Sequence, residues 1–153
     1  MNRFLKGMVI AVTALAFNAS AFAADATATA DDAKAIVKRA VTYLKANGKE
    51  KMLAEASNQS GQFVKGDSYL SIYDQSGKVL AHGTNAKLIG KDVSELKDAD
   101  GKFFIKEILA AAKKDGKGWE DYKWPNPVTK EIQNKSVYFE QVNDLIIASG
   151  FYK

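Results

Sequence analysis

The chain carries few of the side chains that most catalytic and metal sites require. Its 153 residues include no cysteine and only one histidine, His82. The lack of thiolates excludes zinc fingers, iron–sulfur clusters and cysteine nucleophiles, and a single histidine excludes any multi-histidine metal site. No serine or carboxylate is spaced from His82 in a way that suggests a catalytic triad. We therefore expect no metal, no cofactor and no enzymatic activity.

The densest group of potential binding residues is the segment 118–127, which reads Gly-Trp-Glu-Asp-Tyr-Lys-Trp-Pro-Asn-Pro. In a strand, Tyr122 and Trp124 share one face, whereas Lys123 points to the other. Two large aromatic side chains with polar groups, followed by a rigid turn, are suited to wall a pocket for a small molecule. Packing of a sheet against a helix explains the same residues equally well, so composition alone leaves both interpretations open.

The first 23 residues have the layout of a secretory signal peptide. Arg3 and Lys6 precede an apolar run over residues 8–17, and Ala-Phe-Ala at 21–23 supplies the small residues that a signal peptidase reads. The apolar run, about ten residues, is too short for a helix that spans a bilayer core of about 30 Å. A secreted chain without cysteine suits a bacterial periplasm. We therefore expect cleavage after residue 23 and a periplasmic protein.

Charge excludes nucleic acid as a partner. Loss of the two basic residues of the signal segment lowers the formal net charge from +4 to +2, and every remaining cation except Arg39 is a lysine. These lysines alternate with Asp and Glu along the chain, whereas nucleic-acid-binding proteins usually gather Arg and Lys on one face. No later apolar stretch approaches the length of a membrane helix, so we expect the mature chain to be soluble.

The first half of the mature chain predicts a helix followed by a hairpin. After a flexible lead-in over residues 24–30, apolar side chains recur three and four residues apart and predict one long helix over 31–59, bent or broken at Gly48. The apolar period then changes, and residues 68–83 predict a β-hairpin. Residues 84–101 are polar and form a long loop.

The second half predicts another helix and three strands. An amphipathic pattern predicts a helix over residues 103–115 that ends at Gly116. Three strands are expected at 118–124, 134–142 and 145–152. Short links between the late strands favour an α+β domain in which a long helix packs on one face of a five-stranded antiparallel sheet. A domain of this length buries about two-thirds of its unfolded surface, which is enough for one stable core.

The stretch from Tyr69 to Tyr152 resembles a single Cache domain, the extracellular sensor module of many bacterial chemoreceptors and sensor kinases. The segments that carry the resemblance are 69–74, 77–82, 88–92, 98–102, 116–119, 121–125, 135–138 and 148–152. Their order and spacing together make the resemblance specific. With the leading helix it covers residues 31–153, which we expect to form one Cache-like domain.

The resemblance implies a PAS-like sheet with the long N-terminal helix on one face and a ligand pocket, closed by loops, on the other. It also implies a small ligand, often a carboxylate of two or three carbons, which needs a cation and hydroxyl or amide donors. The candidate ligand-binding residues are Tyr73, His82, Tyr122, Trp124, Lys135 and Tyr138. We favour Lys135 over Lys123, because strand alternation turns Lys123 away from Tyr122 and Trp124.

These observations predict a soluble periplasmic module that binds a short-chain carboxylate and signals through a membrane receptor or sensor kinase. The alternative is a protein-interaction or regulatory module without a small ligand, which acts on another periplasmic protein or forms a homodimer. Tyr43, on the second face of the long helix, favours that alternative. In receptors such a domain is bracketed by membrane helices, whereas this chain ends at Lys153, directly after the last expected strand. We therefore expect a stand-alone module.

Overall fold

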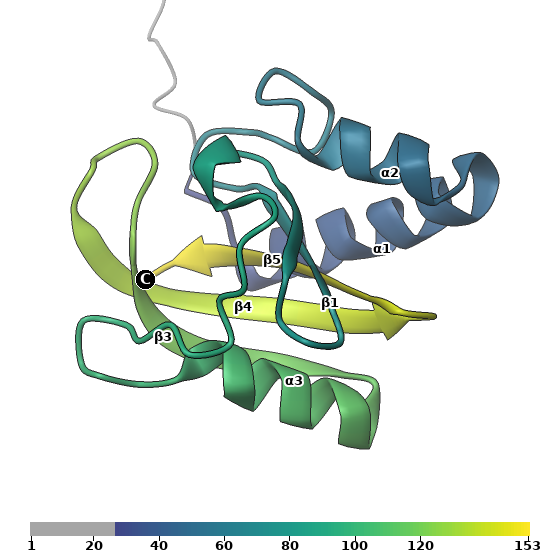
Figure 1. Ribbon diagram of the computed structural model, residues 1–153. Coiled ribbons are helices and arrows are strands. Elements are labelled where there is room, and N and C mark those ends of the chain that lie inside the picture. The colour runs from purple at the N-terminus through teal and green to yellow at the C-terminus, as the bar shows by residue number, and fades with distance from the viewer. Residues whose placement is uncertain (1–26) are drawn as a thin grey trace, which may run out of the picture.

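The computed structural model describes residues 27–153, so the expected signal peptide and residues 24–26 of the expected lead-in lie outside the described residues. Two helices, a hairpin, a short 3-10 turn, a third helix and three strands follow one another (Figure 1). Their bounds are α1 (Ala30–Asn47), α2 (Lys49–Ala56), β1 (Leu70–Asp74), β2 (Val79–His82), η1 (Ala86–Leu88), α3 (Phe104–Asp115), β3 (Lys117–Pro125), β4 (Ile132–Val142) and β5 (Leu145–Tyr152). The predicted order of helices and strands is confirmed.

The long N-terminal helix begins and breaks for local reasons. The Thr29 hydroxyl accepts a hydrogen bond from the Asp32 amide at 3.2 Å, and the Asp32 carboxylate accepts one from the Thr29 amide at 2.8 Å. This reciprocal pair satisfies two amides that a helix start leaves free. The helix ends at Gly48, whose φ of 85° suits glycine, and α2 follows directly. The predicted break at Gly48 is confirmed.

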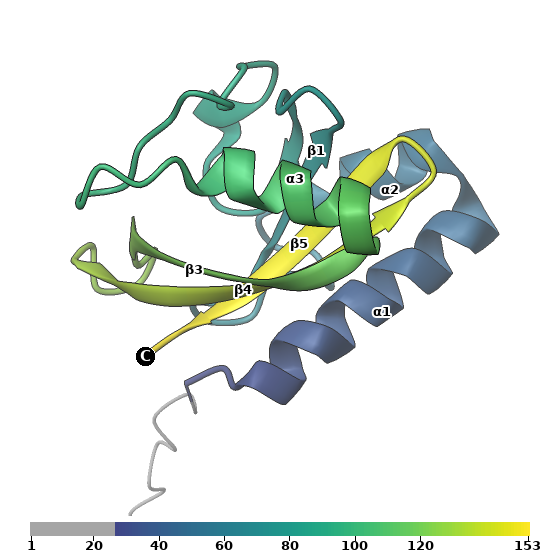
Figure 2. The same ribbon diagram turned by 90° about the horizontal axis from the view of Figure 1, so that it is seen from below.

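The five strands form one antiparallel sheet in the order β2-β1-β5-β4-β3. The last strand therefore lies in the middle and joins the early hairpin to β3 and β4. Figure 2 shows α1 and α3 on opposite sides of this sheet. The predicted fold, an α+β domain with a five-stranded antiparallel sheet and the long helix on one face, is confirmed. Among residues 27–153, none of the helices has the length and apolar character needed to cross a membrane.

Side-chain alternation divides the core into two layers. Ile72, Ile147 and Tyr138 point toward α1, and Tyr73 and Phe139 point toward α3. The α3 side of the sheet is covered partly by α3 and partly by the loop over residues 84–101. A small internal cavity lies between the sheet and these two segments.

Tyr43 belongs to the edge of the α1 core. Its ring meets that of Phe63 edge-on, with 5.7 Å between the ring centres, and its side chain is half-buried. Because Tyr43 packs against the core, it does not make the outer face of α1 apolar.

Candidate functional site

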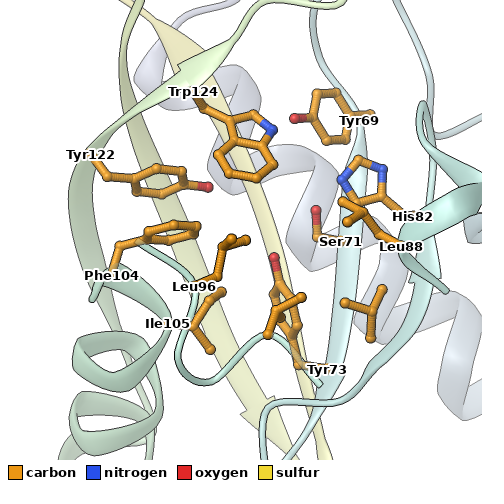
Figure 3. Close-up of a pocket in the computed structure, with 12 residues that line it drawn as sticks. Tyr69, Ser71, Tyr73, His82, Leu88, Leu96, Phe104, Ile105, Tyr122 and Trp124 are labelled. Carbon is orange, nitrogen blue, oxygen red and sulfur yellow. The ribbon is translucent and has the colours of Figure 1, made fainter. Parts of the chain in front are cut away.

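A small cavity lies on the α3 side of the sheet, enclosed by the β1–β2 hairpin, the loop over 84–101, the start of α3 and the end of β3 (Figure 3). Its lining consists of Tyr69, Ser71, Tyr73, Val79, His82, Leu88, Val93, Leu96, Phe104, Ile105, Tyr122 and Trp124. The centre of a water molecule can move through about 10 Å³ of this space, which is room for about one water. The cavity is thus mostly apolar, with a few polar groups on its walls.

Four of the predicted binding residues meet here, although they come from three different strands. Tyr73, His82, Tyr122 and Trp124 all line the cavity, and the hydroxyl groups of Tyr73 and Tyr122 point into it (Figure 3). Phe104 stacks on Tyr122 with 4.0 Å between the ring centres, which fixes the direction of the tyrosine. The arrangement offers hydrogen-bond donors to a small polar ligand.

Lys135 lies directly behind the cavity wall. Its position in β4 pairs with Tyr122 of β3 and Tyr152 of β5, so its side chain points to the same face of the sheet. The ammonium donates a hydrogen bond to the Tyr69 hydroxyl at 2.7 Å and lies 4.0 Å from the centre of that ring. Tyr69, a lining residue, therefore separates the Lys135 charge from the cavity.

The charge of Lys135 is buried without an ion-pair partner. The residue is only 3% exposed, and the ion pairs formed among residues 27–153 all use other lysines. Asp67, also buried, acts on it only through a longer-range attraction. Burial lowers the pKa of the Lys135 ammonium to about 7. An isolated buried cation is costly, because no water or counterion compensates it.

His82 presents a neutral ring. Its Nδ1 accepts hydrogen bonds from the backbone amides of Asn85 at 3.0 Å and Thr84 at 3.3 Å. Because Nδ1 is an acceptor, the proton of the neutral ring lies on Nε2. Burial, together with the positive charge of Lys135, lowers the pKa of His82 to about 3. The residue therefore serves as an uncharged donor near neutral pH.

Tyr138, a predicted binding residue, and Lys123, which was set aside in favour of Lys135, both lie elsewhere. Tyr138 is three residues beyond Lys135 in β4, so alternation turns it to the α1 side. There its hydroxyl donates to Glu140 at 2.6 Å and its ring packs on Trp119. The expectation that Tyr138 shares the pocket is corrected. The Lys123 ammonium pairs with Asp100 at the surface, at 3.0 Å, which agrees with the preference for Lys135.

Sequence reasoning missed two tyrosines beside Lys135. The Tyr152 hydroxyl lies 3.4 Å from that of Tyr69 and donates to the Pro125 carbonyl at 2.9 Å. Tyr69 precedes Tyr73 by four residues, so the period of two already placed both on one face. Tyr152 is different, because only the β4–β5 register brings it next to Lys135.

The loop over residues 84–101 is fastened over the cavity at its far end. The Asp98 carboxylate accepts hydrogen bonds from the amides of Asp100, Lys102 and Lys123, at 2.9, 2.9 and 3.0 Å. These bonds, that from Lys123 above all, hold the pKa of Asp98 below its usual range. Because Lys123 belongs to β3, Asp98 ties the loop to the edge of the sheet.

Two curated proteins are similar to part of this chain. The methyl-accepting chemotaxis protein McpP of Pseudomonas putida is 34% identical over 88 residues, which are 56% of this chain and 16% of that protein. The sensor histidine kinase MctS of Rhizobium johnstonii is 31% identical over 88 residues, 56% of this chain and 19% of that protein. The chain therefore spans less than a fifth of the length of these relatives.

Three solved structures share the fold. A methyl-accepting chemotaxis protein from Vibrio parahaemolyticus has 27% identity and a TM-score of 0.67, covering 80% of this chain and 86% of that one. A Cache chemosensory domain, solved to explain carboxylic acid recognition, has 28% identity and a TM-score of 0.62, with the same coverage. A periplasmic sensor domain of a chemotaxis protein, at 22% identity and a TM-score of 0.64, covers 80% of this chain and 88% of that chain.

The family described as Single Cache domain 2 matches residues 6–153, nearly the whole chain. The sheet order, the helix on one face and the loop-covered cavity on the other agree with that match. Cache sensory domains are ligand-binding modules without catalytic activity. The chain belongs to the single Cache domain family, and the proteins similar to it include chemotaxis proteins and a sensor histidine kinase.

Proposed function

We propose that the protein is a sensor module that binds a short-chain carboxylate on the α3 side of its sheet. The observation that carries this proposal is the buried ammonium of Lys135, whose hydrogen-bond partner among the described residues is the neutral hydroxyl of Tyr69. An anion is the group that this position lacks, because a carboxylate adds an attraction between opposite charges that a neutral hydroxyl does not supply. The similar Cache chemosensory domain whose structure explains carboxylic acid recognition supports the same ligand class.

Binding requires Tyr69 to move aside. Its hydroxyl occupies the place beside Lys135 that a carboxylate oxygen would take, and its ring closes the cavity on that side. Once the Tyr69 ring turns, the cavity extends to the Lys135 ammonium. The second carboxylate oxygen then accepts from Tyr122 and His82, and Phe104 with its apolar neighbours surrounds a short alkyl chain. The small size of the cavity favours acids of two or three carbons.

We further propose that the protein is exported, cleaved after residue 23, and works in the periplasm by binding and not by catalysis. A periplasmic sensor domain with the same fold supports this location. The ligand's presence is reported to a membrane-bound receptor or histidine kinase, the two kinds of protein represented by the curated relatives.

Thermal unfolding against a ligand panel tests the proposal. The panel contains acetate, propionate, lactate and pyruvate beside amines and amino acids of similar size. A ligand at about 100 times its dissociation constant adds about 2.7 kcal/mol of stability. For a domain of this size we expect the melting temperature to rise by several degrees with at least one acid and to stay unchanged with amines. An unchanged melting temperature with every acid would favour the protein-interaction module instead.

A further inference from the structure

Carboxylate binding uses the ammonium form of Lys135 and leaves its amine form without a role. We propose that Lys135 also captures carbonyl compounds, 2-oxo acids and small aldehydes, by forming a reversible imine through Nζ. This inference rests on the proposed function in one respect, since it requires a small ligand to reach Lys135. It goes beyond that function because the ligand becomes covalently attached.

The surroundings of Nζ are those of a nucleophilic amine. Within residues 27–153, no carboxylate forms an ion pair with Lys135, and its aliphatic chain runs across Gly150, where a Cβ atom would lie 2.9 Å from Cε. Burial lowers the pKa of Lys135 to about 7, so about half of the molecules hold a free amine at that pH. An exposed lysine, with a pKa of about 10.4, has about one free amine in a thousand or fewer.

The ionisable groups around Nζ come from every neighbouring element: Asp67 from the loop before β1, Tyr69 beside it, His82 from β2, Tyr122 from β3 and Tyr152 from β5. His82 is neutral near pH 7, as its lowered pKa shows. Burial raises the pKa of Tyr69 well above its usual value and that of Tyr152 to about 12. Both tyrosines therefore stay neutral near pH 7, and neither places a negative charge beside Nζ.

Tyr69 holds Nζ in the unliganded protein, with its hydroxyl 2.7 Å from Nζ and 3.4 Å from the Tyr152 hydroxyl, and it turns aside when the carbonyl compound enters. The amine lone pair attacks the carbonyl carbon, and one proton passes from Nζ to the carbonyl oxygen. The resulting carbinolamine then loses its hydroxyl group, with a second proton, as water. Amine and carbonyl compound thus give imine and water, with no oxidant or reductant.

A 2-oxo acid fits both parts of this site. Its carbonyl carbon is bonded directly to the carboxylate carbon, so a carboxylate held by the donors Tyr122 and His82 places the carbonyl group next to Nζ in its amine form. The protonated imine keeps the positive charge of the lysine and therefore still attracts the carboxylate. Donors on the cavity wall, Tyr122 and His82, remain available to the carboxylate oxygens.

Reductive trapping tests this inference. The purified full chain is incubated at pH 7 with pyruvate and sodium cyanoborohydride, which reduces a protonated imine to a stable secondary amine, and is then analysed by intact mass and peptide mapping. We expect an adduct on Lys135, formed at least about tenfold faster than on any exposed lysine because of the larger amine fraction, and peptide mapping separates it from an adduct on the N-terminal amine. Acetate in excess should slow its formation. Lys135→Arg, which keeps the charge, should remove the adduct, and Lys123→Arg should not.

Labelling of exposed lysines at the same rate as Lys135 would overturn the inference, as would an unchanged adduct in Lys135→Arg. If Lys135→Arg fails to fold, peptide mapping of the unaltered protein still shows whether the adduct lies on Lys135. Calorimetry with acetate on the same preparation separates the two claims. Acetate binding without an adduct on Lys135 overturns the imine and leaves the proposed function standing. An adduct on Lys135 without acetate binding supports the imine and contradicts carboxylate sensing.

Discussion

The ammonium group of Lys135 is buried, and it donates a hydrogen bond to the Tyr69 hydroxyl. Burial lowers its pKa from the ordinary value of 10.5 to about 7. Between these two values the unfolded chain binds more protons than the folded one, so this residue makes stability rise with pH. Below pH 7 both states hold the proton, and the full cost of the buried charge is present. The residue thus destabilises the unliganded fold, and the anion that we propose as its ligand would offset this cost.

Replacement of Lys135 by methionine should therefore stabilise the unliganded protein. At pH 6 we expect Lys135→Met to raise the free energy of unfolding by about 1–4 kcal/mol, as other replacements of buried ionic groups do. The gain should shrink as the pH rises from about 7 toward 10.5. Denaturant unfolding at both ends of that range measures it, and Lys123→Met, at an exposed position, is the control. A less stable Lys135→Met protein at pH 6 would contradict the buried-charge interpretation.

The affinity for a carboxylate should depend on the protonation of Lys135. The proposed function has acetate bind to the ammonium form, so its affinity should stay level from about pH 5.5 to 6.5, where a carboxyl group with a pKa near 4.3 is ionised. Above pH 7 the affinity should fall about tenfold per pH unit as the free protein loses this proton. Calorimetric titration at several pH values gives the profile. Constant affinity from pH 6 to 9 would show that Lys135 is not the cation.

Two tyrosines distinguish the two faces of the sheet. Tyr122→Phe removes a hydroxyl that points into the cavity, and we expect affinity for the acid to fall about tenfold or more, the usual cost of a hydrogen bond to a charged group. Tyr138→Phe removes a hydroxyl on the α1 side and should leave affinity unchanged. Equal effects of the two substitutions, measured by the same titration, would contradict the placement of the site.

At the scale of single residues, strand alternation was the strongest guide in the sequence. It grouped Tyr122 with Trp124 and turned Lys123 away, as the structure has them. The same rule, applied to β4, separates Lys135 from Tyr138, so that correction was available without a structure. The place of Tyr152 in the site could not be predicted by alternation, because its contact with Tyr69 depends on which strands are neighbours.

At the scale of elements, apolar period and turn residues were enough to predict the helices and strands and the break at Gly48. Both signals are local, since each depends on residues a few positions apart. The order of the strands is not local. The central place of β5 follows from its pairing with β1, more than 70 residues earlier, and from burial on both faces. The sheet order, and with it the assembly of the pocket, therefore required the structure.

The loop over residues 84–101 should depend on Asp98 for its attachment to β3. Asp98→Ala removes the acceptor of three backbone amides, so we expect the amides of Lys102 and Lys123 to exchange hydrogen about tenfold faster or more. The folded protein lowers the pKa of Asp98, so the stability that this carboxylate contributes is fully present above its ordinary pKa of 3.8. That stability is lost as the pH falls below 3.8 and through the lowered pKa. Asp100→Ala, at a surface ion pair, should change exchange much less, and equal effects would exclude a latch at Asp98.

At the scale of the whole molecule, one sheet separates two kinds of packing. The α1 side is filled mainly by aliphatic side chains with a few aromatic rings, whereas the α3 side places aromatic rings, hydroxyl groups and the charge of Lys135 around a small space. The apolar layer supplies stability through burial. That stability allows the other layer to keep an uncompensated cation, which a ligand can neutralise. The division agrees with the ligand pocket that we propose on the α3 side of the sheet.

Calorimetric titration of acetate and propionate at pH 6, into the unaltered protein and into Lys135→Met, tests the central claim most directly. The account predicts binding at a single site in the unaltered protein and no measurable binding in the variant, which stays folded and melts at a higher temperature. Binding of equal affinity in both proteins would contradict it, because the buried ammonium would then have no part in recognising the acid.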